Sequence, residues 1–291
     1  MTFAHLPVLV REVVDLLSPR EGGTYVDATI GLGGHSEVLL EKIGLDGRIV
    51  GIDRDEEALR RTAERLHDDR LILRKGSFSG IAGLLRAEGI GEVDGILLDL
   101  GVSMMQLKDL TRGFSFTSAG RLDMRMDMSQ PISAWDIVNS WQDRDLVRIL
   151  REYGEEYRAA RIVRWITEAR KKKTIDTCAE LAGLIERAVG RSGRTHPATR
   201  TFQALRIQVN REMEELAGAL DASLGLLGKG GRLCVISYHS LEDRIVKNFI
   251  RDNAKKMTLL PLVKKPVTAG MEELRANPSA RSAKLRGAEK L

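Results

Sequence analysis

The amino-acid sequence predicts an α/β protein in which a helical insertion interrupts a parallel sheet. Over residues 24–100, short apolar runs alternate with amphipathic helical runs, a pattern typical of a parallel sheet covered on both faces. Over residues 111–211 no strand pattern continues, and strand character returns at residues 232–237. We therefore expect a sheet domain formed by residues 1–110 and 212–291, with an inserted helical domain at residues 111–211.

The first part of the sheet is expected from four buried runs that are separated by turns and helices. These strands span residues 24–28, 48–52, 71–74 and 93–98. Amphipathic runs predict helices between them at residues 35–43, 55–66 and 79–88. The connections are short, so each helix should return the chain to a parallel strand.

The insertion is expected to be helical throughout. Helices are predicted at residues 143–153, 155–172 and 176–189. Thr177 and Glu180 have the spacing of a capping box at the start of the last of these. Pro197 opens a further long helix, in which apolar residues recur every three or four positions as far as Leu220.

The second part of the sheet follows the turn cluster Gly228–Gly231, where residues 232–237 predict a strand. Ser240 and Asp243 are expected to cap a helix that runs to about Asn253. Residues 258–263 and 266–267 predict a last pair of strands.

Composition excludes several classes of protein. Of the 291 residues, 43% are hydrophobic and 30% are charged, which is the balance of a folded protein and not of a disordered chain. The two cysteines, Cys178 and Cys234, cannot build a disulfide framework or a structural zinc site, and this favours a reducing cytoplasm. Residues 1–11 lack the pattern of a signal peptide and no apolar run approaches membrane-spanning length, so we expect no membrane association.

A nucleotide-type ligand is expected at the ends of the first two strands. Gly31, Gly33 and Gly34 follow a strand and open a helix, where a glycine backbone can approach a ligand closely. Asp53 ends the second strand, 20 residues after Gly33, where its carboxylate can accept hydrogen bonds from ribose hydroxyls. Ser36 stands where the dinucleotide fingerprint has its third glycine, and no phosphate loop is present. A cofactor without phosphate, S-adenosylmethionine, fits better, whereas the alternative is a structural turn with Asp53 as a helix cap.

Two further residues lie at neighbouring strand ends. Phe78, just past the third strand, is a candidate to cover an adenine ring and equally a candidate core aromatic. Asp99 ends the fourth strand, beside the point where the strand order of such sheets reverses, and there it would face the reacting centre. Its alternative role is to cap the following turn.

Eight sequence blocks then point to a known family. They are His5–Leu9, Asp27–Ser36, Gly51–Asp55, Leu98–Ser103 with Gln106, Arg112–Phe116, Leu122–Asp127, Tyr238–Arg244 and Asn277–Arg286. In this order they closely resemble the bacterial ribosomal RNA small subunit methyltransferase H family, also called MraW. The resemblance runs almost from end to end. It implies a Rossmann-like, class I S-adenosylmethionine-dependent methyltransferase sheet with an inserted all-helical domain. It also implies methyl transfer to the exocyclic N4 of a cytidine in the decoding region of 16S ribosomal RNA, within the small subunit.

The resemblance also implies a set of site residues. Gly33, Gly34 and His35 would contact the methionine portion of the cofactor, and Asp53 its ribose. Phe78, Asp99 and Gln106 would complete the pocket around the adenine and the methyl donor. His35 alone would otherwise be interpreted as a capping or exposed residue.

The cysteines help to choose between methylation chemistries. Methylating C5 of a pyrimidine usually needs a cysteine nucleophile, but Cys234 lies in an apolar strand and Cys178 at the start of an insertion helix. An exocyclic amine needs instead an acceptor for its protons, for which Asp99 is the first candidate. His239, just past the strand that ends at Ser237, is a second candidate, although a local hydrogen bond would also explain it.

Asp123 and Asp127 are four residues apart, so a helix would place both carboxylates on one face. There they would bind a metal or order Arg125. Two carboxylates without a third ligand are weak evidence for a metal site, so we expect no metal requirement.

The charge distribution indicates RNA binding more than the net charge of +5 does. Between Arg191 and Arg211 there are five arginines and no acid. RNA contacts are expected from Lys171, Lys172, Lys173, Arg194, Arg200 and Arg206, although a lysine run is more often a solvated helix end. The aromatics Phe114, Phe116 and Trp135 are candidates to stack on a splayed-out base, or else belong to the core. No obligatory protein partner is predicted, and the alternative function is a non-catalytic ribosome-assembly factor that binds RNA through a retained methyltransferase fold.

Overall fold

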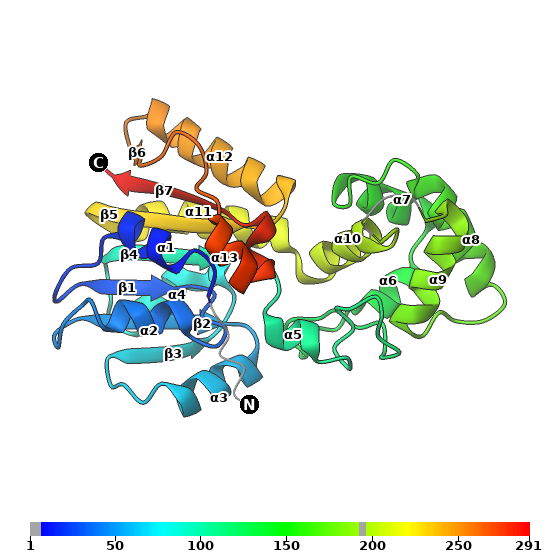
Figure 1. Cartoon of the computed structure of the whole chain (residues 1–291), viewed down its shortest axis with the longest axis horizontal. Helices are drawn as coiled ribbons and strands as arrows, with labels where there is room; N and C mark the ends of the chain where they lie inside the picture. Colours follow the sequence, from blue (N-terminus) through cyan, green and yellow to red (C-terminus); the bar gives the residue numbers. More distant parts are fainter. Residues whose placement is uncertain (1–6, 192–195) are drawn as a thin grey trace. The chain divides into compact units, whose positions relative to one another are not determined.

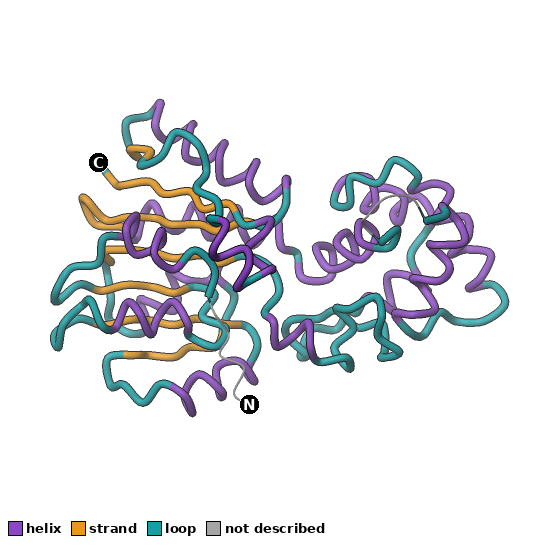
Figure 2. Tube along the Cα trace, viewed as in Figure 1, coloured by secondary structure: helices purple, strands orange, loops and turns teal. Residues whose placement is uncertain are grey.

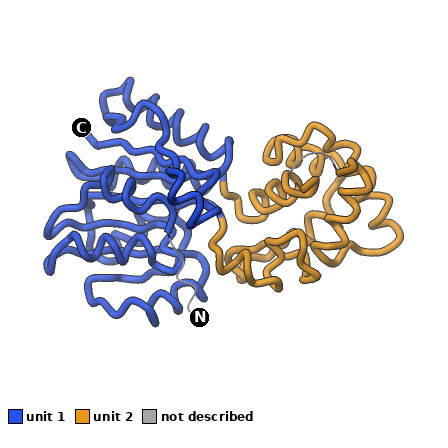
Figure 3. The backbone as a smooth tube through the Cα atoms, in the orientation of Figure 1, with its two compact units in different colours: residues 1–101, 213–291 blue, residues 102–212 orange. Residues whose placement is uncertain are grey.

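The computed structural model describes residues 7–191 and 196–291, and the chain divides into two compact units (Figure 3). Unit 1 comprises residues 1–101 and 213–291, and unit 2 comprises residues 102–212. The chain therefore passes between the units after residues 101 and 212, whereas the sequence predicts the division after residues 110 and 211. Figure 2 shows that the strands lie in unit 1, whereas the described part of unit 2 consists of helices and loops.

Unit 1 is built on a seven-stranded sheet with the order β3-β2-β1-β4-β5-β7-β6 (Figure 1). The strands are β1 Thr24–Asp27, β2 Arg48–Asp53, β3 Leu71–Lys75, β4 Val93–Asp99, β5 Leu227–Ser237, β6 Leu259–Pro261 and β7 Lys284–Lys290. Strands β1 to β5 pair in parallel, whereas β7 runs antiparallel to both of its neighbours. The strand order reverses at β1, which pairs with β2 on one side and β4 on the other.

Helices cover both faces of this sheet. The helical segments of unit 1 are α1 Val10–Leu17, α2 Gly34–Leu40, α3 Glu56–Arg65, η1 Phe78–Gly80, α4 Ile81–Ala87, α11 Glu212–Leu226 (from its second residue on), α12 Ser240–Lys255, α13 Met271–Ala276 and η2 Pro278–Ser282. Because side chains alternate along a strand, Tyr25 packs with α1 and α2 on one face, while Val26 packs with α4, α11 and α12 on the other. The predicted fold class, a Rossmann-like α/β sheet with an inserted all-helical domain, is confirmed.

The first four strands and the helices between them lie where the sequence predicts them, with ends that differ by a few residues. The second part of the sheet differs more. Strand β5 begins at Leu227, so the predicted turn cluster Gly228–Gly231 lies inside the strand, where the register against β4 shifts. Val93 of β4 pairs with Leu227, but Gly95, two residues on, pairs with Arg232, five residues further along β5. The extra residues of β5 form a bulge, which the glycines accommodate.

The predicted last strand pair is wrong. Strand β6 pairs with β7, and Val267 forms an isolated bridge with Leu285, which also belongs to β7. Strand β7 itself is not predicted from the sequence, because only Leu285 and Ala288 interrupt a run of charged residues and glycine. Its ladder with β5 extends from Arg232 to Ser237, and this pairing, which sequence periodicity cannot reveal, stabilises the strand.

The cap of α12 is also different from the prediction. The N-cap is His239, and Glu242 completes a capping box with it, whereas Ser240 and Asp243 are already inside the helix. Histidine is not among the usual N-cap residues, which explains the error.

Unit 2 is a helical domain with its own hydrophobic core, centred on residues such as Leu146, Ile162 and Leu181. Its helices are α5 Met104–Lys108, α6 Ala134–Ser140, α7 Asp143–Glu152, α8 Ala159–Arg170, α9 Cys178–Val189 and α10 Thr199–Asn210. The predicted capping box of Thr177 and Glu180 is confirmed at the start of α9. No helix among residues 7–191 and 196–291 combines the length and the apolar character that a membrane crossing requires.

One helix prediction for this part of the chain is wrong, and a second segment lacks the helix that would place two carboxylates on one face. The long helix expected from Pro197 to Leu220 is divided into α10 and α11, because Arg211 adopts a left-handed conformation with φ 51°. The segment that contains Asp123 and Asp127 is not helical, because Met124 between them is also left-handed, with φ 64°. Neither position carries the glycine or proline that usually signals a break.

Candidate functional site

Three carboxylates lie at one edge of the sheet in unit 1. Asp27, Asp53 and Asp99 are the final residues of β1, β2 and β4, and these strands are neighbours in the sheet. Parallel strands end at the same edge, so the fold gathers acids that are far apart in sequence. Asp53 and Asp99 are predicted from the sequence, whereas Asp27 was missed. The feature that identifies Asp53 and Asp99 is also present at Asp27, because this residue ends an apolar strand just before the glycine loop.

The glycine loop between β1 and α2 is held against α3. Gly31 and Gly33 both have positive φ angles, of 52° and 75°. A Cβ atom on Gly33 would lie 2.7 Å from Cδ1 of Leu66 and 2.9 Å from Cγ2 of Thr62, so only glycine fits there. The hydroxyl of Thr62 also donates a 2.7 Å hydrogen bond to the carbonyl of Gly31. The turn is therefore fixed before any ligand binds.

Asp53 connects this loop to the end of β2. The backbone N–H of Gly31 donates to its Oδ2 at 2.9 Å, and that of Asp55 donates to its Oδ1 at 2.8 Å. Burial raises the pKa of Asp53 to about 6, although these two hydrogen bonds act in the opposite direction. Asp53 does not cap a helix, because the N-cap of α3 is Asp55.

Asp27 lies beneath the loop, with 2% of its surface exposed. The hydroxyl of Ser36 donates a 2.7 Å hydrogen bond to Oδ2, and the N–H of Thr29 donates at 3.3 Å to Oδ1. Burial raises the pKa of Asp27 above its usual range, while nearby His35 acts in the opposite direction. Ser36, which replaces the third glycine of the dinucleotide fingerprint, therefore serves to hold Asp27.

Asp99 has neighbours from three other segments of unit 1. The phenol of Tyr238, which follows β5, donates a 2.8 Å hydrogen bond to Oδ1. The imidazole Nδ1 of His35 lies 3.8 Å from Oδ2, and the hydroxyl of Thr29 accepts a 2.6 Å hydrogen bond from the backbone N–H of Asp99. Burial raises the pKa of Asp99 to about 6, opposed by His35 and by the Tyr238 hydrogen bond.

His35 is a buried residue of α2, with 7% exposure. Its Nε2 lies 2.8 Å from the carbonyl oxygen of Val8, and since a carbonyl only accepts, Nε2 carries a proton. Gly34, directly before it, packs against Pro7, where a Cβ atom would come within 3.0 Å. The fold therefore brings Gly33, Gly34, His35, Asp53 and Asp99 to one edge of the sheet, and their contacts with a cofactor stay a prediction.

Phe78 lies in the short 3-10 helix after β3 and packs against the core that contains α4. The guanidinium of Arg54 lies 5.5 Å from its ring centroid. Arg54 is in turn buried and paired with Glu215 at 3.2 Å. Phe78 is thus partly a core residue, and its contact with an adenine ring stays a prediction. Gln106 lies in unit 2, where it forms a capping box with Ser103 at the start of α5.

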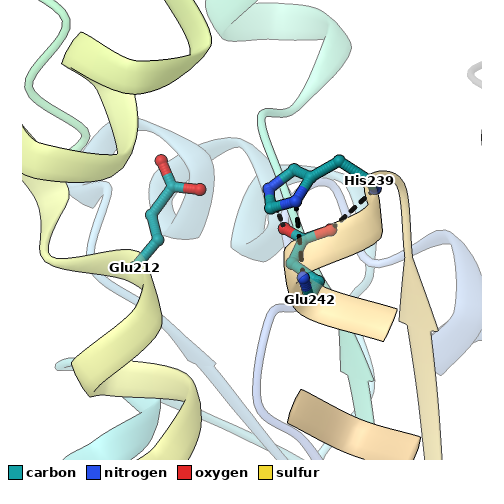
Figure 4. Close-up of side chains that lie close together, drawn as sticks. All are labelled: Glu212, His239 and Glu242. Atoms are coloured by element: carbon teal, nitrogen blue, oxygen red, sulfur yellow. Dashed lines mark hydrogen bonds and ion pairs between the residues drawn. The ribbon is translucent and has the colours of Figure 1, made fainter. Parts of the chain in front are cut away.

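His239 is bonded to Glu242 within the first turn of α12 (Figure 4). Its Nδ1 accepts from the backbone N–H of Glu242 at 3.4 Å, and its Nε2 lies 3.1 Å from Oε1 of that residue, without the geometry of a hydrogen bond. Glu212, drawn in the same view, is the last residue of unit 2 and forms an ion pair with Arg206. The observed contacts of His239 are therefore those of a helix cap, and its catalytic role stays a prediction.

Both cysteines are inaccessible. Cys178 and Cys234 are free and fully buried. Burial raises the pKa of each thiol to about 12, so neither is a thiolate at neutral pH.

The predicted RNA-binding residues of unit 2 differ in their surroundings. Lys171, Lys172, Lys173 and Arg200 are exposed, although Lys171 pairs with Glu168 and Lys173 with Glu180. Arg206 is largely buried and forms two hydrogen bonds of 2.8 Å with Glu212. Arg194 lies outside the described residues.

The aromatics expected to stack on a base are buried or half-buried. Phe114 is 9% exposed, Phe116 stacks on His196 with a centroid distance of 4.4 Å, and Trp135 donates to Asp176. Among the described residues, the aromatic side chains that are exposed are Tyr157, at 74%, and Trp165, at 36%. These two were missed because exposure cannot be determined from composition.

The exposed aromatics flank a basic face of α8. Tyr157 directly precedes Arg158, the N-cap of α8. Arg161, Arg164 and Trp165 follow within the helix, and all four residues 157, 161, 164 and 165 are exposed. The guanidinium groups of Arg158 and Arg200 lie 5.3 Å and 5.9 Å from the Tyr157 ring. We call residues 157, 161, 164 and 165 the α8 face.

Asp123 orders Arg125, which is one of the two alternatives predicted for it. The carboxylate of Asp123 accepts from Nε and Nη2 of Arg125 at 2.9 Å and 2.8 Å. Asp127 accepts from the backbone and hydroxyl of Ser129.

Comparison with known proteins gives full-length matches. Residues 2–291 match the model of the MraW methylase family. The ribosomal RNA small subunit methyltransferase H of Trichlorobacter lovleyi is 49% identical over 309 residues, covering 99% of this chain and 99% of that protein. The proteins of the same name from Caldicellulosiruptor bescii and Geobacter sulfurreducens are 46% and 47% identical, covering 99% and 100% of this chain and 100% of each protein. The family predicted from the sequence blocks is confirmed.

Proposed function

The chain belongs to the MraW methylase family and is a methyltransferase, and from this we propose that it methylates the exocyclic N4 of a cytidine in the decoding region of 16S ribosomal RNA. S-adenosylmethionine is the methyl donor. The observation that carries the proposal is the position of Asp53 and Asp99, on either side of β1 and beside the glycine loop. In this proposal Asp53 would bind the cofactor and Asp99 would bind the amine.

The residues of unit 1 fit this cofactor. Each oxygen of Asp53 accepts one backbone N–H and retains capacity for a second hydrogen bond, which the two ribose hydroxyls would use. Asp27, Asp53 and Asp99 together make the strand ends acidic, and this disfavours a pyrophosphate but suits a sulfonium cation. Gly33, Gly34 and His35 would contact the methionine portion, and Phe78 would contact the adenine.

Asp99 performs the chemical role that an exocyclic amine requires. S-adenosylmethionine supplies a methyl group bonded to a positively charged sulfur. The lone pair of a cytosine amine is delocalised into the ring, so the amine must be oriented and must lose a proton as the new C–N bond forms. The bond between the methyl carbon and sulfur would break in the same step, with S-adenosylhomocysteine as the neutral leaving group. Asp99 accepts a hydrogen bond from one amine N–H and then takes that proton. With its pKa near 6, Asp99 is ionised at neutral pH yet more basic than an ordinary aspartate.

The cysteines support an amine and not a ring carbon as the acceptor. A C5 methyltransferase needs a thiolate that reaches the pyrimidine ring. Cys178 and Cys234 are the two cysteines of the chain, and both are buried with raised pKa values. No thiolate is therefore available to add to the ring.

Unit 2 supplies the RNA-binding surface in this proposal. Lys171, Lys172, Lys173 and Arg200 are exposed cations that can neutralise phosphates. The α8 face adds two exposed aromatics with two arginines between them, a combination suited to stacking on unpaired bases. The substrate is the small-subunit particle in the cytoplasm, with no membrane and no obligatory protein partner involved.

The decisive experiment offers labelled S-adenosylmethionine to the protein with small-subunit particles that lack the modification, with naked 16S RNA and with DNA. Nucleoside analysis should find N4-methylated cytidine in the RNA. Label at C5, or label only in DNA, would contradict the proposed chemistry. RNA binding without any methyl transfer, by a protein that still binds the cofactor, would favour the non-catalytic assembly factor.

A further inference from the structure

Tyr238 touches Asp99 but has no part in the function proposed so far. It follows the end of β5 and directly precedes His239, which forms the α12 cap with Glu242. Its phenol donates a 2.8 Å hydrogen bond to Oδ1 of Asp99. The two residues are 139 positions apart in the chain, so this hydrogen bond is a tertiary feature of the sheet edge.

Tyr238 is held by one contact of its backbone and one of its ring. Its backbone N–H donates a 2.7 Å hydrogen bond to Oε2 of Glu242, a carboxylate with 2% exposure. On the other side the ring faces Gly101, where a Cβ atom would lie 3.4 Å from the ring carbon Cδ2. Gly101 has φ 98°, a conformation that glycine adopts without strain. The turn after β4 thus leaves room for the ring.

We propose that Tyr238 is a positioning residue that holds Oδ1 of Asp99, so that Oδ2 is the oxygen presented to the methyl-accepting amine. This inference rests on the proposed function and deepens it. Among the described side chains around Asp99, Tyr238 is the one that reaches its carboxylate at hydrogen-bonding distance, since Nδ1 of His35 lies 3.8 Å from Oδ2.

Burial, together with nearby negative charge, favours the protonated form of the Tyr238 phenol. Burial and the charge of Asp99 raise the pKa of its phenol, so the phenol keeps its proton and cannot itself remove one from the amine. The other charged groups that face Asp99 are His35, Asp27 and Glu242. His35 favours the ionised form of Asp99, whereas the two acids oppose it. Loss of the phenol would therefore raise the pKa of Asp99 further.

The test compares Tyr238→Phe with the wild type, both as full-length protein. Phenylalanine keeps the ring beside Gly101 and removes only the donor. We expect kcat for methyl transfer to small-subunit RNA to fall at least about tenfold. We also expect the acidic limb of the kcat profile to move to higher pH, while the Kd for S-adenosylmethionine changes less than about threefold.

Tyr25→Phe is the matched control. Tyr25 is a buried tyrosine of β1 in the same sheet, and its hydroxyl accepts from the backbone N–H of Arg20, away from Asp99. This variant should lose some thermal stability but keep the pH profile of the wild type. If Tyr238→Phe leaves both kcat and the pH profile unchanged, Tyr238 does not position Asp99.

A second readout separates this inference from the proposed function. NMR titration of the protein with 13C-labelled aspartate side chains, with Asp99 assigned through Asp99→Asn, reports the pKa of Asp99 without catalysis. The pKa should be higher in Tyr238→Phe than in wild type. If no substrate is methylated but this pKa rises, the proposed function fails while the Tyr238–Asp99 coupling stands. An unchanged pKa would overturn the coupling itself.

Discussion

The backbone N–H of Gly31 donates a 2.9 Å hydrogen bond to the carboxylate of Asp53, and this bond connects the glycine loop after β1 to the end of β2. The glycine loop would contact the methionine portion of the cofactor, and Asp53 would hold its ribose. The hydrogen bond therefore couples the two parts of the cofactor site. Changes at Asp53 should affect both.

Asp53→Ala should weaken the binding of S-adenosylmethionine about 10- to 100-fold, because it removes charged hydrogen bonds of about 1.5–3 kcal/mol and frees the loop. Isothermal titration calorimetry measures this directly. Glu56→Ala is the control, since Glu56 is an exposed acid three residues further on that pairs with Lys75 at the surface. Equal affinity in wild type and Asp53→Ala would remove Asp53 from the cofactor site.

The free energy of unfolding of the cofactor-free protein should depend on pH because the pKa of Asp53 is raised in the folded state. Its pKa is about 6 in the folded protein and 3.8 as an ordinary value, so folding favours the protonated form. The stability that Asp53 contributes is complete below about pH 4 and is lost as the pH rises through 6. The melting temperature of Asp53→Asn should therefore increase relative to wild type between pH 4 and pH 7. A constant difference over that range would show that burial does not shift this group.

Replacing both cysteines, Cys178→Ala and Cys234→Ala, should leave methyl transfer intact. An amine acceptor requires no thiolate, and the two thiols are buried. The double variant should lose about 1–2 kcal/mol of stability, because each change leaves a small cavity. Radiolabel incorporation into small-subunit RNA at a temperature below the melting point is the measurement. Complete inactivity in a folded, cofactor-binding variant would indicate a covalent route.

Asn210→Ala should destabilise unit 2 by about 3 kcal/mol. Asn210 is 1% exposed, and its amide bonds the backbone of residues 124 and 126, which lie in the loop that contains left-handed Met124. Without the amide, two buried backbone groups lose their partner. Urea denaturation measures the change, with Gln208→Ala, a partly exposed change on the same helix, as the control. Equal losses for the two variants would show that the loop does not depend on Asn210.

The double variant Arg161→Ala, Arg164→Ala should bind RNA more weakly and with less dependence on salt. The slope of the logarithm of the binding constant against the logarithm of the salt concentration should become smaller by about 1 for each phosphate that is no longer neutralised. Both arginines belong to the α8 face, and cofactor affinity should not change. Arg144→Ala with Arg148→Ala removes the same charge from α7, where each arginine has an acidic partner. Fluorescence anisotropy at several salt concentrations gives the slopes. If the two double variants lose the same affinity, only net charge matters and the α8 face has no special role.

The sequence was sufficient to predict the fold where local patterns and tertiary pairing agree. Strands β1, β2 and β4 are largely buried because helices cover both faces of the sheet, and such apolar runs are recognisable alone, whereas the edge strand β3 is only partly buried. Strand β7 was missed since its run of lysine, arginine and glutamate is stabilised by β5 and β6, not by its own periodicity.

The breaks at Met124 and Arg211 were missed for a related reason. A left-handed backbone conformation costs free energy at a residue other than glycine, and nothing in the local sequence indicates it. Tertiary contacts such as those of Asn210 compensate for this cost.

The candidate site was predictable to the extent that strand ends reveal it. Asp53 and Asp99 were found because each ends an apolar strand, and parallel strands bring such ends together. Tyr238 and the α8 face were not found. In the sequence, a tyrosine that contacts an aspartate from a distant loop looks the same as a core aromatic, and so does an aromatic that stays exposed. Only the folded structure distinguishes them.

The sheet of unit 1 is assembled from two stretches of chain with the whole of unit 2 between them. During translation β1 to β4 leave the ribosome first, and residues 102–212 follow as a complete sequence for a helical core of their own. Until β5 emerges, the β4 side of the growing sheet is an unpaired edge, open to wrong partners. A messenger cut short before β5 should therefore yield a nascent chain that aggregates, with a helical domain already formed inside it.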